Sequence, residues 1–302
     1  MKIRLNPIVK KDLKVTVRSM RMSWGLFAYE AVLAVAFLLA LLIIQSESNY
    51  IGSGNIYSSL VYLFPVVAVA QVCIVALYVP IITASSISGE KERQTFDLML
   101  TTCMSPFSIV FGKVISAVIR ILFFVAASMP IMAMSFVVGG LSWSNLLYYL
   151  LALLLFSLFA GSVGILASSF CRKSVGAVLL SFVLYFVFFL LTFVPALVYA
   201  LMSRGEYGET PLFLLVNPGV FFEEVFAQML LGQSVLGRDS GTFSRSDVGI
   251  LTYTLAHGKV WMFVSAGCIL GMSVLLMGLA AWKVNPLHSG SGRRRGKKKA
   301  AD

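Results

Sequence analysis

The stretch WGLFAYEAVLAVAFLLALLIIQ, residues 24–45, decides the class of fold. It contains a single charged residue, Glu30, and no proline that would interrupt a helix. A helix rises by about 1.5 Å per residue, so one of this length can cross the roughly 30 Å hydrocarbon core of a bilayer. The stretch therefore predicts a membrane-spanning helix rather than part of a water-soluble core.

Five more apolar runs repeat this pattern along the chain. The composition agrees, because 59% of the 302 residues are hydrophobic and only 12% are charged, against about 25% charged residues in an average soluble domain. We predict an all-α polytopic membrane protein in which one domain, residues 24–283, carries six transmembrane helices. The five further spans are expected at about 56–84, 108–138, 145–170, 174–202 and 260–282.

The segment in front of the first span, residues 1–23, is predicted to form an amphipathic helix. Val9, Leu13 and Val17 recur at helical spacing, while lysines and arginines cover the remaining positions. Such a helix lies along a membrane surface with its basic side chains facing anionic headgroups. The other end of the chain, residues 284–302, is a basic tail that we expect to be disordered.

The distribution of Lys and Arg predicts the orientation in the membrane. One side of the predicted spans collects 19 of the 24 basic residues, with seven before the first span and seven from Lys283 onward. Four lie on the other side, and Arg120 lies within a span. Because loops rich in Lys and Arg stay in the cytoplasm, we expect both termini and the amphipathic helix to be cytoplasmic. The protein is expected to be a multi-pass protein of the plasma membrane.

A long segment, residues 203–258, separates the fifth and sixth spans on the predicted outer side. Part of it, residues 211–232, is apolar enough to suggest a seventh span, but it contains Glu223 and Glu224. Two carboxylates near the centre of a bilayer are costly. We therefore expect a re-entrant or interfacial hairpin that is buried against protein rather than lipid.

Two charged side chains fall inside predicted spans. Glu30 and Arg120 each lie about 10 Å below the cytoplasmic boundary, given the rise of a helix per residue. Charges at this depth are costly unless they are paired, so one hypothesis brings the two together as an intramembrane charge pair. The alternative is that each side chain reaches separately to the membrane surface.

The charges and cysteines exclude several classes of function. The net charge of +11 does not indicate nucleic-acid binding, because the basic residues gather at the chain ends and in short loops. The four cysteines are far apart, and the chain has only two histidines. Their spacing is not typical of a metal site or of structural disulfides. We expect no metal and no nucleic-acid partner, and a lipid bilayer around the chain.

The most informative loop joins the second and third spans, at residues 85–113: SSISGEKERQTFDLMLTTCMSPFSIVFGK. Gly89 is expected to end the helix of the second span, and residues 90–101 are expected to form a short amphipathic helix. Acidic residues suit the positive N-terminal end of such a helix. Its charged start carries Glu90, Glu92 and Arg93, and its apolar face carries Phe96, Met99 and Leu100.

This loop resembles the ABC-2 type permease family, whose members are membrane subunits of ATP-binding-cassette exporters. The residues that carry the resemblance are Gly89 to Arg93, Thr95, Leu98 to Leu100, Ser105-Pro106 and Gly112-Lys113. An amphipathic helix before six spans, and a long outer segment before the last span, are also similar to the family. The resemblance covers most of the chain, and this loop is its locally specific part.

The resemblance implies that residues 90–101 are a coupling helix, which sits in a groove of a separate ABC ATPase subunit and transmits its movement. The chain contains no GxxxxGK[ST] pattern, so ATP and Mg are expected on that partner and no cofactor in this chain. A second permease subunit, identical or different, would complete the transporter of a prokaryotic cell. The implied ATPase-coupling residues are Glu90, Glu92, Arg93, Phe96, Met99 and Leu100.

The favoured hypothesis is a transport subunit of an ATP-driven exporter, not itself an enzyme, with residues 203–258 gating the exit. Two alternatives stay open. Glu223-Glu224 suggests an intramembrane hydrolase, although the arginine and histidines expected after such a pair are missing. A membrane scaffold or sensor subunit is also compatible with six spans.

Overall fold

The computed structural model describes residues 14, 19–51, 60–95, 106–140, 142–202, 214–230, 232 and 260–284. Within these ranges every regular element is an α-helix, and no strand occurs. In chain order the helices are α2 (Met20–Ile51), α4 (Leu63–Glu92), α6 (Pro106–Ala127), α7 (Met129–Val138), α8 (Trp143–Phe170), α9 (Ser174–Met202), α11 (Pro218–Leu230) and α14 (Val260–Val284).

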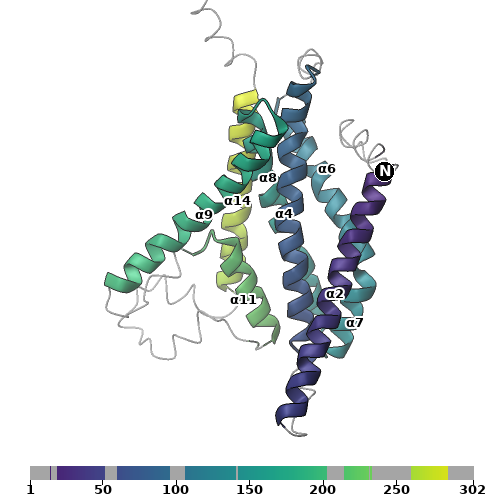
Figure 1. Cartoon of the computed structure of the whole chain (residues 1–302). Coiled ribbons are helices and arrows are strands. Elements are labelled where there is room, and N and C mark those ends of the chain that lie inside the picture. The colour runs from purple at the N-terminus through teal and green to yellow at the C-terminus, as the bar shows by residue number, and fades with distance from the viewer. Residues whose placement is uncertain are drawn as a thin grey trace, which may run out of the picture.

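Six of these helices are long and apolar enough to cross a membrane: α2, α4, α6, α8, α9 and α14. The predicted all-α fold with six membrane spans is therefore confirmed. The spanning helices form one bundle in Figure 1, from which α9 inclines away. The start of α2 and the end of α14 lie at the same end of the bundle (Figure 1), because consecutive spans alternate in direction.

We name this end of the bundle the basic end, because described lysines and arginines gather there. It comprises the end of α4, the start of α6, the turn between α8 and α9, and the end of α14. We name the other end, where α2 ends and α8 begins, the opposite end. The cationic residues of the basic end are Lys91, Arg93, Lys113, Arg172, Lys173 and Lys283.

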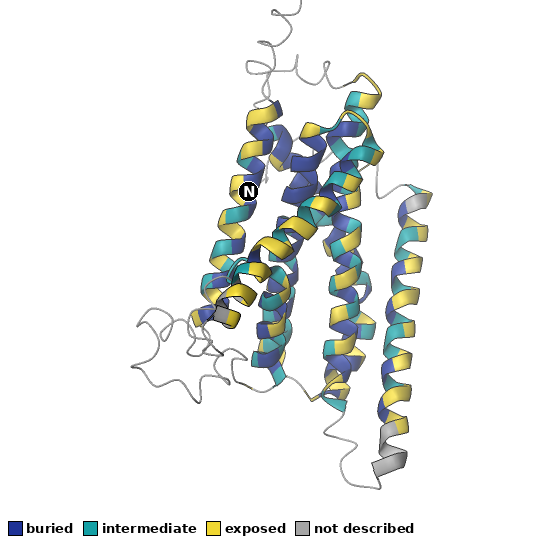
Figure 2. Cartoon of the chain, turned by 60° about the vertical axis from the view of Figure 1, so that its left-hand side comes forward, coloured by how far each residue is buried: buried dark blue, intermediate teal, exposed yellow. Residues whose placement is uncertain are grey.

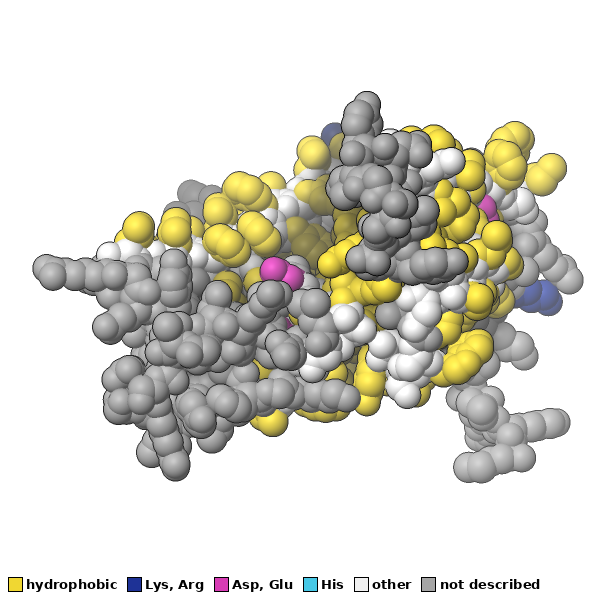
Figure 3. Space-filling view, turned by 90° about the horizontal axis from the view of Figure 1, so that it is seen from below, with side chains coloured by type: hydrophobic (Ala, Val, Ile, Leu, Met, Phe, Trp, Pro, Cys, Tyr) yellow, Lys and Arg dark blue, Asp and Glu magenta, His cyan; other side chains and the backbone are white. Residues whose placement is uncertain are grey.

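The outward faces of the helices are hydrophobic, which is the reverse of a soluble protein. Leu42 of α2 and Phe186 of α9 are 61% and 62% exposed. Figure 2 shows exposed residues along the outer helices, and Figure 3 shows hydrophobic side chains around the rim of the bundle. Apolar faces of this extent suit contact with lipid chains rather than with water.

The tightest packing in the described bundle joins α4 to α8. Gly161 and Gly164 of α8 face α4, and a Cβ atom added at Gly164 would overlap Thr83 Oγ1. The same added atom would lie 3.1 Å from the carbonyl oxygen of Pro80. Small residues allow two membrane helices to approach closely, where lipid offers little hydrophobic driving force for association. Gly164 is therefore required by the distance between the two helices.

Helix α4 continues through Gly89 and ends at Glu92, so the predicted break at Gly89 is wrong. The helix is held here by α8, because the Ser168 Oγ accepts hydrogen bonds from the backbone N–H groups of Ile87 and Ser88 at 3.0 and 2.9 Å. A glycine inside a helix costs only about 1 kcal/mol relative to alanine. Contacts with a neighbouring helix are sufficient to offset that cost.

The third span divides at Ser128 into α6 and α7, and Pro130 lies in the first turn of α7. A buried polar cluster occupies this junction. The Gln71 Nε2 of α4 donates to the Tyr29 hydroxyl of α2 at 2.7 Å and to Ser128 Oγ at 3.2 Å. The Gln71 Oε1 accepts from the Tyr149 hydroxyl of α8 at 2.8 Å. Since both ends of the amide are satisfied, the cluster joins the helices at little desolvation cost.

The outer hairpin predicted within 203–258 is represented by α11, which has 13 residues. At about 1.5 Å per residue this helix is too short to cross a bilayer. It lies at the opposite end, beside α8 and α14 (Figure 1). The Phe222 ring of α11 packs edge-on against Phe156 of α8, with centroids 5.4 Å apart. Glu223 is exposed and Glu224 is buried.

Two predicted segments fall largely outside the described residues. Of the amphipathic helix at 1–23, the structure describes Lys14 and residues 19–23, where α2 begins. Of the basic tail at 284–302, it describes Val284, the last residue of α14. Both segments stay predictions.

Substituting Gly164 tests the packing between α4 and α8. Gly164→Ala is expected to lower the free energy of unfolding by about 1–3 kcal/mol, the usual cost of overpacking, because the new methyl group meets Thr83. Gly267→Ala on α14 is the matched control, since a Cβ there meets no atom within 4 Å. Unfolding in mixed micelles, followed by circular dichroism, measures both variants. Equal stability of the two would contradict the close approach of α4 and α8.

Candidate functional site

Three consecutive residues at the end of α4 contact three other helices, and we name these residues and their partners the clasp. The first contact is an ion pair in which Lys113 Nζ of α6 lies 2.8 Å from Glu90 Oε1. The Lys113 side chain is only 6% exposed and that of Glu90 is 29% exposed. Partial burial shields this pair from salt, unlike an exposed pair, which is typically worth less than about 1 kcal/mol.

The second contact of the clasp is made by Lys91. Its Nζ donates to the carbonyl oxygens of Ser169, Ser168 and Cys171 at 2.6, 3.3 and 3.4 Å. The last carbonyl groups of a helix have no partner within the helix, and they form its negative end. The ammonium group of Lys91 therefore caps the C-terminus of α8.

The third contact is made by Glu92. It resembles the second contact, but with the opposite charge and at the opposite end of a helix. The Glu92 Oε2 accepts hydrogen bonds from the backbone N–H and the hydroxyl of Ser174, at 3.2 and 2.8 Å. Ser174 is the first residue of α9, where free N–H groups form the positive end of the helix. A carboxylate from α4 therefore caps the N-terminus of α9.

A further cation brings α14 to the same place. Lys283, in the last turn of α14, has its Nζ 5.3 Å from the centroid of the Phe170 ring at the end of α8. An ammonium group over an aromatic face is attracted by the ring quadrupole. The basic end thus gathers the ends of α4, α6, α8, α9 and α14 around the clasp.

The chain reverses direction immediately after the clasp. Gln94 has a φ of 58°, a left-handed conformation that is uncommon outside glycine. The N–H and hydroxyl of Thr95 both donate to the Glu90 carbonyl oxygen, at 3.0 and 3.3 Å. The side chains of residues 92–95 are exposed. The end of α4 is therefore set by this turn, and the described residues of the turn are exposed.

The predicted coupling residues are placed only in part. Glu90 and Glu92 belong to the last turn of α4, so a separate helix does not begin at residue 90 as predicted. Arg93 follows in the exposed turn. Their role in coupling to an ATPase stays a prediction. The residues of the predicted apolar face, Phe96, Met99 and Leu100, lie outside the described residues.

The clasp also contains residues whose roles the sequence did not reveal. Lys91 lies in the last turn of a helix and Ser174 is the first residue of another, and both positions are typical of capping. Those signals are local. The partners of both residues come from other helices, so sequence spacing alone did not identify them.

Glu30 and Arg120 form no ion pair with each other in the structure; within the described ranges the recorded ion pair is Lys113 with Glu90. The Glu30 Oε1 and the Arg120 Nε are each buried without a hydrogen-bond partner. Tyr29 packs on Phe124 of α6 with ring centroids 5.1 Å apart. The next residue along a helix points about 100° away, so Glu30 does not share the direction of Tyr29. The predicted contact is therefore not formed.

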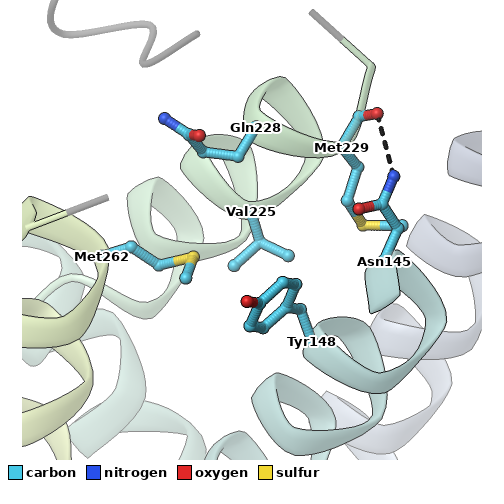
Figure 4. A pocket seen from close by; sticks show the side chains of 6 residues that line it. All are labelled: Asn145, Tyr148, Val225, Gln228, Met229 and Met262. Atoms are coloured by element: carbon cyan, nitrogen blue, oxygen red, sulfur yellow. Dashed lines mark hydrogen bonds between the residues drawn. The ribbon is translucent and has the colours of Figure 1, made fainter. Parts of the chain in front are cut away.

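A small hollow lies at the opposite end, between α8, α11 and α14 (Figure 4). Its lining is mixed, with thioether and aliphatic side chains beside two amides. The Asn145 Nδ2 donates to the Met229 carbonyl oxygen at 3.2 Å, so this amide already fastens α11 to α8. The lining residues are Asn145, Tyr148, Val225, Gln228, Met229 and Met262.

The described residues offer no cluster of three or more His, Cys, Asp or Glu side chains that could hold a metal ion. The carboxylates of the clasp instead accept hydrogen bonds from Lys113 and Ser174. What the clasp can do is mechanical, because it joins helix ends through charge-assisted hydrogen bonds.

A double-mutant cycle tests the ion pair of the clasp. Glu90→Gln and Lys113→Met, singly and together, are expected to show a coupling free energy of about 1–3 kcal/mol, as for groups that share one polar network. Arg172→Gln combined with Lys113→Met is the control, because Arg172 is exposed at the same end and no contact joins it to Lys113. Unfolding in mixed micelles gives the stability of the wild type and of each variant in the two cycles. Simple additivity of Glu90→Gln and Lys113→Met would show that the pair contributes nothing.

A profile of the family described as ABC-2 family transporter protein matches residues 6–283. That range includes the six spans, the clasp and α11. A comparison with curated proteins gave no match. Because the profile covers most of the chain, this multi-pass membrane protein belongs to the ABC-2 transporter family and is a permease subunit.

Proposed function

We propose that the chain is the transmembrane subunit of an ATP-driven exporter and forms half of a translocation path with a second permease subunit. A separate ABC ATPase would bind ATP and Mg²⁺ and supply the energy. The observation that carries the proposal is the clasp. One short run of residues after a spanning helix is bonded to α6, α8 and α9, at the place where the segment 93–105 begins.

Force applied to segment 93–105 would reach several spans at once. The segment leads directly from α4 to α6, so any partner that moves it moves the ends of both helices. Lys91 and Glu92 extend the connection to α8 and α9, because each holds a helix terminus with charge-assisted hydrogen bonds. A clasp of this kind suits the transmission of a movement from a partner subunit into the membrane.

The basic end is the cytoplasmic end in this proposal. Loops rich in Lys and Arg remain in the cytoplasm, and the ATP that drives the transporter is available there. Both chain termini then face the cytoplasm of a prokaryotic cell, and the second permease subunit is either a copy of this chain or a different one.

The opposite end then faces outward, and α11 with the segment 203–258 gates the exit. Hydrogen bonds hold this region to three spans in the described structure. The Ser265 hydroxyl of α14 donates to the Leu215 carbonyl oxygen at 2.6 Å, and the Asn217 Nδ2 donates to Thr192 Oγ1 of α9 at 3.0 Å. The bond from Asn145 fastens the far end of α11 to α8. Release of these few contacts would open the exit without disturbing the α4–α8 seam.

Coupling is tested by co-expressing the tagged chain with a candidate ABC ATPase from the same organism, first any whose gene lies next to that of this chain. We expect the wild-type chain to retain the ATPase through purification, and Met99→Asp to reduce the retained amount by at least about tenfold, as for a hot-spot residue at an interface. Val138→Asp is the matched control, because Val138 is an exposed apolar residue at the opposite end.

Three results would oppose the proposal. If the wild-type chain retains no ATPase, the chain is not a subunit of such a transporter. Loss of the ATPase from the Val138→Asp variant as well would show that misfolding rather than docking is responsible. Hydrolysis of lipid or peptide by the purified chain without any ATPase would favour the intramembrane hydrolase.

A further inference from the structure

Arg120 of α6 is a cation inside a membrane span that lacks a counter-charge among the described residues. Its Nε is buried without a hydrogen-bond partner, although the side chain as a whole is partly exposed. A guanidinium group keeps its proton in proteins, so burial cannot neutralise it. An unpaired charge within a span is costly and typically marks a functional site.

The packing around Arg120 locates its side chain where three helices meet. Phe124, one turn further along α6, contacts Tyr29 of α2 at 5.1 Å and Tyr78 of α4 at 4.9 Å between ring centroids. Helical side chains lean toward the N-terminus of their own helix, and α6 begins at the basic end. Arg120 therefore leans toward the membrane surface at the basic end.

The carboxylates near this region do not neutralise Arg120. Glu90 is engaged by Lys113, at 2.8 Å. Glu30 forms no ion pair with Arg120, and its Oε1 has no hydrogen-bond partner. The counter-charge is therefore not supplied by the described residues, while part of the guanidinium stays accessible. This combination is what a binding site for an anionic group requires.

We infer that Arg120 binds the anionic headgroup of an amphiphile, a phosphate or carboxylate that carries hydrocarbon chains. The planar guanidinium matches such groups with two parallel hydrogen bonds. Phe123, three residues further along the helix and so a neighbour of Arg120 on its surface, is an exposed hydrophobic side chain, which suits the hydrocarbon part. The inference that Arg120 binds such a group depends on this geometry and not on the proposed function. That the amphiphile is also the class of transported substrate rests on the proposed function.

Native mass spectrometry of the full chain in detergent tests this site, with dioleoyl phosphatidylglycerol as the anionic probe and dioleoyl phosphatidylcholine as the zwitterionic probe. In about 0.5 M salt, exposed charges are screened far more than partly buried ones. The wild-type chain is expected to prefer phosphatidylglycerol, and Arg120→Gln to weaken its binding about tenfold, the effect of losing one charge-assisted contact. Glu30→Gln should bind at least as tightly as wild type.

Arg172→Gln is the matched control, because it removes the same group from an exposed turn at the basic end. It should leave the affinity in high salt unchanged. Equal affinities of Arg120→Gln and wild type, or equal loss in Arg172→Gln, would overturn the site. Equal binding of both lipids would overturn its selectivity for an anion. Displacement of the lipid by an equal concentration of inorganic phosphate would show a site for free anions and overturn the amphiphile.

A measurement on the wild-type chain covers the case in which Arg120→Gln does not fold. A ligand that binds the native state raises the unfolding temperature, so phosphatidylglycerol should raise it more than phosphatidylcholine in the same salt. Equal unfolding temperatures would overturn the inference. Capture of the ABC ATPase by the wild-type chain does not depend on Arg120, so failure of this site and failure of the proposed function are distinguishable.

Discussion

The interior of a bilayer offers no water to bind the backbone of a span, so the protein itself supplies partners for the free backbone groups at the helix ends. The clasp meets that constraint at the basic end with three residues in a row. Lys91 takes up the free carbonyl groups at the end of α8, and Glu92 takes up free donors at the start of α9. Because the end of one span completes the ends of its neighbours, these helices cannot move independently there. The same bonds that satisfy the backbone thus also make a mechanical connection.

The spans were predictable because the signal that defines them is local. Length and hydropathy identified all six without knowledge of any contact. The prediction that the helix breaks at Gly89 was wrong because it considered only the low helix propensity of glycine, which is worth about 1 kcal/mol. It left out the contacts that this part of the helix makes with other helices. In the folded chain, Ser168 binds the N–H groups of Ile87 and Ser88 from about eighty residues away. No sequence window contains both partners, so the end of α4 was misplaced.

The candidate site shows the same difference between local signals, which the sequence contains, and contacts between distant residues, which it does not reveal. In the sequence, Glu90 and Gly112-Lys113 belong to one family-like pattern. The ion pair between Glu90 and Lys113 could not be predicted from it, because that contact depends on how α4 and α6 pack together. For Glu30 and Arg120 the rise per residue gave their depth. It did not give the direction in which each side chain points. The depth of a residue in the membrane follows from its position along the chain. The direction in which its side chain points depends on how the helix is rotated about its axis by packing against its neighbours.

Lys113 and Arg120 show how the packing of a helix determines which partners its side chains meet. They are seven residues apart on α6, so they lie almost on one line along the helix, with a drift of only about 20°. Lys113, which is nearer the basic end, forms an ion pair with Glu90 and has a nearly buried side chain. Arg120 lies one turn from Phe124, which packs on Tyr29 of α2 and Tyr78 of α4, and it pairs with no carboxylate among the described residues. A paired charge at the rim stabilises one arrangement of the helices. In the inferred site the unpaired charge two turns deeper is stabilised by an anionic group that enters from outside, so the contact of α2, α4 and α6 serves binding as well as packing.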